Sequence, residues 1–217
     1  MKISRYRVPQ GPQAATQPGS RGRVLLNRLG LTSKRAIDRV EAQALARVQE
    51  TYYARLTSKT RITSSLLKRM HRDWLGEIYE WAGHYRWVEL EKDGFRWPPA
   101  ERVADNMREL ERDFLRQYTP CKPGSLVQVA MAIAVVHAEL LLIHPFRDGN
   151  GRLARWVADV MAIQAGYPAP AYGFSGRGNK KRRIEYLAAI QRGYVQNYAP
   201  LARFLEEAIL RRREAER

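Results

Sequence analysis

The sequence predicts a mainly α-helical fold with a single β-hairpin. Two observations predict it: apolar residues recur at helical spacing along most of the chain, and only one segment alternates as a strand does before an Asp-Gly pair. With 217 residues, 45% of them hydrophobic, the chain can bury one sizeable core. We expect a flexible basic arm over 1–24, a folded domain over 25–212 and a basic tail over 213–217.

The expected arm is rich in Pro, Gly, Gln, Ser and Arg and has few apolar side chains, a composition typical of flexible segments. A helix is predicted after the Thr-Ser pair at 32–33, which can cap it. Its apolar face comprises Ile37, Val40, Ala44 and Val48. A second helix is predicted over 63–81, where apolar residues recur as far as Trp81 and Gly83 can end it.

The hairpin is predicted from residues 85–97. Residues 85–91 are typical of a strand, Asp93-Gly94 of a tight turn, and residues 95–97 of a returning strand before two prolines. A lone hairpin is marginally stable unless it packs on helices. It is therefore either a structural cover or a flap with an unpaired edge.

The remaining elements are predicted as helices over 100–118, 126–143, 151–166, 181–194 and 200–213. The segment 126–143 is apolar nearly all round, which favours a central helix. Because it contains Gln128, His137 and Glu139, a buried core helix is favoured over a membrane span.

The charge balance favours a polyanionic partner. Lys and Arg number 38 against 22 Asp and Glu, giving a net charge of +16. Nucleotides, nucleic acid and an acidic protein all fit such a charge. No zinc-finger or RNA-binding signature accompanies it, so a basic nucleic-acid-binding module is an alternative that rests on charge alone. The four histidines show no zinc-binding spacing.

Compartment is predicted from the single cysteine, Cys121, and from the N-terminus. One cysteine allows no intrachain disulfide, which fits a reducing cytoplasmic setting. The basic N-terminus lacks an apolar stretch of the kind found in secretory signals. Export by a specialised secretion system stays an open alternative, because such signals need not be hydrophobic.

The most informative segment, residues 144–155, reads His-Pro-Phe-Arg-Asp-Gly-Asn-Gly-Arg-Leu-Ala-Arg. Pro145 places the end of the preceding helix near His144. Arg152 and Arg155 then fall at the positive end of the next helix, which costs a few tenths to ~1 kcal/mol each. A bound anion would relieve that misfit.

The residues between these arginines and the histidine form a plausible phosphate site. Gly149, Asn150 and Gly151 can line an anion-binding nest, since glycines admit the required backbone angles. Asp148 makes sense beside a phosphate if Mg²⁺ bridges the two. His144 can accept a proton near neutral pH.

Each of these residues also has an ordinary interpretation: a helix-end cation for His144, an Asx-turn for Asp148, and a common Gly-Asn-Gly turn. Taken together they instead suggest direct transfer from a nucleoside triphosphate to an acceptor hydroxyl, because the segment offers no evident side-chain nucleophile.

The same twelve residues resemble the signature of the Fic family (filamentation induced by cAMP). Residues 79–86, containing Tyr-Glu-Trp-Ala-Gly and then Tyr-Arg, resemble the segment that precedes the family's flap, and residues 194–205 resemble its closing helices. The resemblance covers roughly residues 25–210 and implies a helical Fic domain with one hairpin flap over the site. It further implies a protein adenylyltransferase that moves AMP from ATP to a Ser, Thr or Tyr hydroxyl.

The resemblance also implies a role for each motif residue. His144 would be the catalytic base and Asp148 the Mg²⁺ ligand. The nucleotide contacts would come from Gly149, Asn150, Gly151, Arg152 and Arg155, with Lys92 and Asp93 of the flap as additional candidates. An extended segment of the target protein would pair with the flap, about residues 88–95, and no direct nucleic-acid contact is expected.

Regulation is the point at which the chain departs from many family members. The inhibitory Ser/Thr-x-x-x-Glu-Gly/Asn motif, whose glutamate would pair with Arg155, does not occur in the sequence. We therefore expect a toxin or effector whose inhibitor, if there is one, is a separate small antitoxin. The intact Gly-Asn-Gly-Arg core argues against the kinase branch; kinase activity and AMP removal remain the alternatives within the family.

Overall fold

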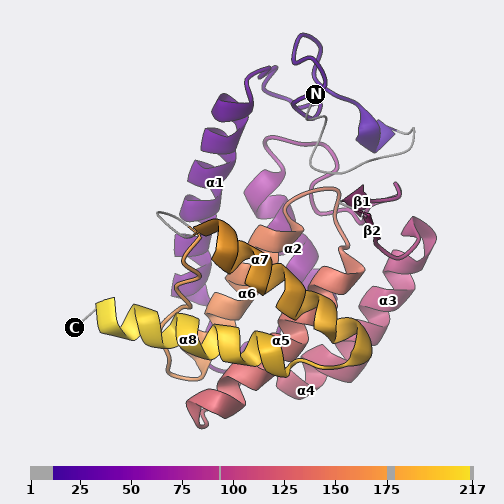
Figure 1. The fold of residues 1–217 in the computed structure, drawn as a ribbon. Coiled ribbons are helices and arrows are strands. Elements are labelled where there is room, and N and C mark those ends of the chain that lie inside the picture. The colour runs from indigo at the N-terminus through magenta and orange to yellow at the C-terminus, as the bar shows by residue number, and fades with distance from the viewer. Residues whose placement is uncertain (1–11, 93, 175–178, 216–217) are drawn as a thin grey trace. The chain divides into compact units, whose positions relative to one another are not determined.

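The computed structural model describes residues 12–92, 94–174 and 179–215. Its elements are mainly helices with one two-stranded antiparallel hairpin, as predicted (Figure 1). The chain forms two compact units. The first comprises Met1–Arg55, Ser64–Met107 and Ile143–Asn150, and the second comprises Leu56–Thr63, Arg108–Leu142 and Gly151–Arg217. The predicted domain bounds, 25–212, stay a prediction.

The first unit contains two packed helices, α1 (Lys34–Arg55) and α2 (Ser64–Leu75). The cap predicted for α1 is present, because the Ser33 hydroxyl accepts a hydrogen bond from the backbone N–H of Ala36. The indole of Trp74 in α2 donates to the backbone carbonyl of Glu41 in α1 at 2.9 Å. This contact fixes the buried face of α2 against α1.

The predicted end of the second helix at Trp81 is wrong, because α2 ends at Leu75. Beyond it the backbone turns, and the N–H groups of Ile78 and Tyr79 both donate to the carbonyl of Leu75. Ile78 and Trp81 are still buried in these turns, so the apolar spacing continues past the helix. Gly83, at φ +80°, ends the turns rather than the helix.

The hairpin is shorter than predicted. Strands β1 (Glu91–Lys92) and β2 (Phe95–Arg96) pair in register, with Lys92 opposite Phe95. Residues 85–90 are not a strand, and the N–H of Arg86 instead donates to the carbonyl of Pro145 at 2.8 Å. The expected turn residue Asp93 lies outside the described residues.

Part of the expected N-terminal arm is described. A short turn of 3-10 helix, η1 (Pro12–Ala14), precedes residues 15–25, where Thr16 and Leu25 form an isolated antiparallel bridge. The side chains of Gln13 and Val24 are buried. The flexibility expected for residues 1–24 stays a prediction, since residues 1–11 lie outside the described part of the chain.

The central helix α5 (Leu126–Ile143) has the bounds predicted for it. It is long and apolar enough to cross a membrane, but 67% of it is buried inside the structure, as in a core helix. A continuous helical run precedes it: η2 (Ala100–Arg102), α3 (Val103–Glu109), the π-helical η3 (Leu110–Leu115) and α4 (Arg116–Tyr118).

In the described part of the chain, α5 is followed by α6 (Asn150–Gln164), α7 (Asn179–Gln191), the 3-10 turn η4 (Arg192–Val195) and α8 (Ala199–Ala215). Helix α6 stops before Gly166, whose φ of +85° is the left-handed geometry expected beyond a helix end. In the second unit, α7 and α8 run side by side (Figure 1).

Candidate active site

The motif divides between the two units along the chain. Residues 144–149 form the loop after α5 in the first unit, and α6 begins at Asn150, one residue before the predicted start. Of the predicted site residues, His144, Asp148, Gly149 and Asn150 lie in the first unit. The others of the motif, Gly151, Arg152 and Arg155, lie on the first two turns of α6 in the second unit.

The loop begins at His144 with an uncommon backbone. His144 has φ +52°, in the left-handed region that non-glycine residues rarely adopt. Its carbonyl accepts a hydrogen bond from Nε of Arg86 at 2.8 Å, and the next carbonyl, of Pro145, accepts from the N–H of Arg86. The imidazole is buried against Trp97, with ring centroids 4.2 Å apart.

Asn150 closes the loop. Its side-chain oxygen accepts from the N–H of Phe146 at 2.8 Å, and its side-chain nitrogen donates to the carbonyl of the same residue at 2.7 Å. Phe146 itself is completely buried. Since the Asn150 amide is engaged at both ends, any nucleotide contact from this residue would come from its backbone.

His71 supports the loop from α2. Its Nδ1 accepts from the N–H of Gly83 at 2.9 Å, so the ring proton sits on Nε2, which donates to the carbonyl of Asp148 at 3.0 Å. The imidazole also stacks on the Phe146 ring, with centroids 3.9 Å apart. Sequence reasoning missed this residue, because a lone histidine on an amphipathic helix carries no signal of a contact 77 positions away.

Asp148 is the residue predicted to hold Mg²⁺. One carboxylate oxygen accepts from the N–H of Gly149 at 2.5 Å, and the side chain is only partly buried. Among the described residues no group of three or more His, Cys, Asp or Glu could form a metal site of protein ligands alone. A single carboxylate beside a phosphate site nevertheless fits Mg²⁺, which is usually held by one or two carboxylates plus phosphates and waters.

Gly149 is required by both its backbone and its surroundings. It has φ +84°, and a Cβ added there would lie 3.0 Å from the Trp74 ring. Any side chain would therefore meet a buried indole that cannot move cheaply. The glycine lets the chain turn into the start of α6.

Gly149→Ala is therefore expected to destabilise the protein more than Gly166→Ala. Both replacements cost about 1–2 kcal/mol for a left-handed backbone. Gly166, at φ +85°, has open space around its missing Cβ, whereas Gly149 adds the Trp74 clash, worth roughly 1–3 kcal/mol more. Urea unfolding of the two variants measures the difference, and equal losses would contradict the close approach.

On α6, Arg155 lies among aromatic rings. Its guanidinium carbon is 5.8 Å from the centre of the Tyr172 ring and 5.6 Å from that of Phe174, within the range of cation–π attraction. A Cβ at Gly151 would make only ordinary contact with Arg155. Packing in the second unit thus does not demand that glycine, and its absent side chain adds no bulk at the start of the helix.

Behind Arg155 lies a buried histidine–tyrosine pair. Nδ1 of His137 donates to the carbonyl of Ala154 at 3.0 Å, so Nε2 accepts from the Tyr186 hydroxyl at 2.5 Å. Burial, with Arg155 nearby, lowers the pKa of His137 to about 3, and burial raises the pKa of Tyr186 to about 12. Both ring nitrogens of His137 are thus hydrogen-bonded within the core.

The low pKa of His137 makes stability depend on pH. The unfolded chain takes up a proton near pH 6.5 that the folded chain accepts only near pH 3, so stability falls as the pH drops through that window. The slope is about 1.4 kcal/mol per pH unit. In urea titrations at several pH values, His137→Gln is expected to flatten this slope, while the exposed His84→Gln keeps it.

The hairpin residues are placed only in part. Lys92 lies on β1, and Asp93 is outside the described residues, so their nucleotide contacts stay a prediction.

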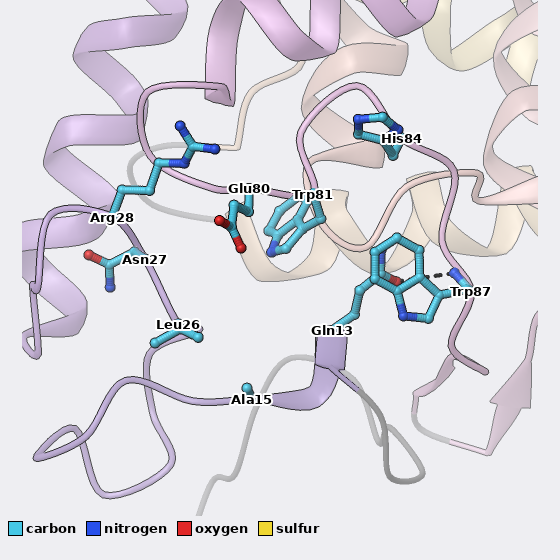
Figure 2. Close-up of a pocket in the computed structure, with 9 residues that line it drawn as sticks. All are labelled: Gln13, Ala15, Leu26, Asn27, Arg28, Glu80, Trp81, His84 and Trp87. Atoms are coloured by element: carbon cyan, nitrogen blue, oxygen red, sulfur yellow. Dashed lines mark hydrogen bonds between the residues drawn. The ribbon is translucent and has the colours of Figure 1, made fainter.

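A separate cavity of about 510 Å³ lies in the first unit, and its lining includes Gln13, Leu26, Glu80 and Trp87 but none of the predicted site residues. Figure 2 shows these side chains, with the Gln13 amide oxygen accepting from the N–H of Trp87. The Gln13 carbonyl accepts from Nε of Arg147 at 2.6 Å, which connects the cavity wall to the motif loop.

Part of the chain is similar to known proteins. Residues 61–162 match the Fic/DOC family. The chain is 26% identical over 144 residues to the protein adenylyltransferase VbhT of Bartonella schoenbuchensis, covering 66% of this chain and 30% of that protein. It is 29% identical over 145 residues to the protein adenylyltransferase Fic of Nematostella vectensis, covering 66% and 31%. The chain thus spans about a third of the length of these curated relatives.

Solved structures share the fold. The BepC protein of Bartonella tribocorum, a VirB-translocated effector solved with bound AMPPNP, aligns with a TM-score of 0.69 at 21% identity, over 85% of this chain and 91% of that one. The N-terminal Fic domain of a Bartonella quintana effector with bound ADP aligns with a TM-score of 0.67 at 20% identity, over 85% and 89%.

Proposed function

We propose that this chain, whose residues 61–162 match the Fic/DOC family, is a protein adenylyltransferase that transfers AMP from ATP to a Ser, Thr or Tyr hydroxyl of a target protein. The observation that carries the proposal is the order of residues along one continuous segment. His144 starts the loop, Gly149 turns it with a positive φ, and the two arginines follow on the first turns of α6. The relatives named as adenylyltransferases support it.

In this proposal the start of α6 binds the triphosphate. The N–H groups of Asn150 and Gly151 would donate to phosphate oxygens, aided by the helix dipole. The N–H of Gly149, which donates to the Asp148 carboxylate in this structure, would join them when that hydrogen bond opens. Arg152 and Arg155 add charge-assisted hydrogen bonds, and the rings of Tyr172 and Phe174 limit where the Arg155 guanidinium can go. The misfit of two cations at a helix start is thereby relieved.

The proposed reaction is a single displacement. The acceptor hydroxyl oxygen bonds to the α-phosphorus, the bond from that phosphorus to the bridging oxygen breaks, and pyrophosphate leaves. The hydroxyl proton passes to His144, while Asp148 would hold Mg²⁺. When bound, Mg²⁺ would supply charge neutralisation at the phosphates.

The target is proposed to bind as an extended segment along the β1–β2 hairpin, whose edge can accept an added strand. Lys92 and Asp93 are proposed as further nucleotide contacts. We place the reaction in a cytoplasm, with export as an alternative that the translocated effector relatives support. A small antitoxin in trans is proposed as the inhibitor, since the sequence lacks the inhibitory motif.

The test compares two isotopic labels. Purified protein is incubated with Mg²⁺ and a candidate target, once with ATP labelled on the α-phosphate and once with ATP labelled on the γ-phosphate. Transfer of the α label alone to protein supports adenylyl transfer. Transfer of the γ label would overturn it in favour of a kinase.

A further inference from the structure

We propose that Arg86 and Trp97 fasten the β1–β2 hairpin to His144 and act as positioning residues for the catalytic base. Arg86 holds the backbone of His144, Trp97 lies against its ring, and both also belong to the segments that flank the hairpin. This inference rests on the proposed function for the role of His144, but the mechanical link can be measured without any reaction.

Arg86 joins three stretches of backbone through one buried side chain. Its guanidinium donates to the carbonyl of Val88 at 3.0 Å, before β1, and to that of Pro98 at 2.6 Å, after β2. The same group donates to the carbonyls of Ile143 at 3.4 Å and His144 at 2.8 Å. Both ends of the hairpin and the start of the motif loop are therefore hydrogen-bonded to the guanidinium of Arg86, a residue that is 2% exposed.

No shorter cation can replace this arrangement. Arginine offers five N–H donors in a planar fork, while lysine offers one point charge on a flexible stem. Burial lowers the pKa of Arg86 to about 10, so the group remains protonated at neutral pH. Without it, several buried carbonyls would lose their donors, at a cost of desolvation for each.

His144 needs such support because its backbone is strained. A histidine at φ +52° is unfavourable in isolation and persists only where neighbouring contacts hold it. Two donors of Arg86 hold the backbone just after this angle: Nε donates to the His144 carbonyl and the backbone N–H donates to the Pro145 carbonyl. Trp97 then restricts the orientation of the His144 imidazole, since the two ring centroids are 4.2 Å apart.

Trp97 is itself held by the segment that precedes the hairpin. Trp97 packs on the buried pair Val88 and Leu90, and its N–H donates to the carbonyl of Leu90 at 3.1 Å. A target segment paired with the hairpin would therefore meet His144 in a fixed register. Since a general base must come within hydrogen-bond reach of its proton, this register affects the rate and leaves nucleotide affinity alone.

The experiment observes His144 by NMR. Only four histidines occur in the chain, so its Cε1–H signal can be assigned by comparison with His144→Gln. In the native protein the nearby Trp97 ring is expected to displace this signal from its free-histidine position. Arg86→Met keeps the tryptophan at position 97 but removes the guanidinium. This variant is expected to remove the displacement and to change the His144 Cα shift, which reports the left-handed backbone. Arg86→Lys is expected to do so in part.

The control is Arg39→Met, an exposed arginine on α1 of the same unit, which is expected to leave the His144 signals unchanged. ATP affinity, measured by calorimetry, is expected to stay at the native value in the Arg86 variants. A folded Arg86→Met protein with native His144 signals would overturn the link, as would a loss of ATP affinity equal to that of an Arg155 variant.

If both Arg86 variants fail to fold, variants of Trp97 test the proposal instead. Trp97→Leu is expected to broaden the His144 signal through exchange between ring positions, and Trp97→Phe to restore a sharp signal. A sharp signal in Trp97→Leu would contradict the proposal. These readouts need no substrate, so failure of the link and failure of the proposed adenylyl transfer are distinguishable.

Discussion

Replacement of His144 by alanine is expected to slow AMP transfer by about 100- to 10,000-fold, the usual contribution of a positioned general base. The alanine cannot accept the hydroxyl proton, whereas the proposed phosphate contacts on residues 149–155 remain. The affinity for ATP should therefore change little. Initial rates with α-labelled ATP and calorimetric ATP binding, measured on the same protein, check the two halves of this expectation.

His84→Ala is the matched control, because His84 is an exposed histidine of the first unit that has no proposed part in the reaction. Its transfer rate should equal the native rate. A His144→Ala protein that transfers AMP within a few fold of the native rate would rule out the base assignment. A protein that instead loses ATP binding would show that His144 supports the loop rather than the chemistry.

Phe146→Ala is expected to lower the free energy of unfolding by about 3–5 kcal/mol, the usual cost of removing a fully buried phenylalanine side chain. Phe146 has no exposed surface and stacks on His71. Its removal leaves a cavity beneath the motif loop, next to the imidazole that holds the Asp148 carbonyl. Urea unfolding followed by circular dichroism measures the loss.

The comparison is Phe95→Ala on β2, where the ring is only partly buried and contacts Trp97 at its edge. This variant should lose much less stability, since less apolar surface returns to water. Similar losses for the two variants would mean that the Phe146 site collapses around the missing ring, and that the loop does not depend on it.

The bounds of a helix could be predicted from the sequence where a single apolar pattern was flanked by clear end signals. The bounds of α5 were predicted because Pro145 and the apolar run 126–143 mark both its extent and its end. The end of α2 was missed because Ile78 and Trp81 remain buried after the helix stops. Spacing alone cannot distinguish a buried turn from another helical turn.

The hairpin shows a second limit. Residues 85–90 have the composition of a strand, yet the N–H of Arg86 bonds to the Pro145 carbonyl, 59 positions further along the chain. No local sequence pattern predicts such a pairing. The motif residues were predicted as a site from their types, their spacing and the family resemblance, whereas the supporting residues His71 and Arg86 became visible only when distant segments were brought together.

The closure of the motif loop by Asn150 has a thermodynamic consequence. Because the Asn150 amide and the His71 ring already fix the backbone between Phe146 and Asn150, a ligand does not have to order this segment. Ordering a flexible residue costs about 1–2 kcal/mol in backbone entropy. A loop that is rigid beforehand leaves that free energy available as affinity, so a nucleotide should bind with a small entropy penalty and little change in backbone amide-exchange protection over these residues.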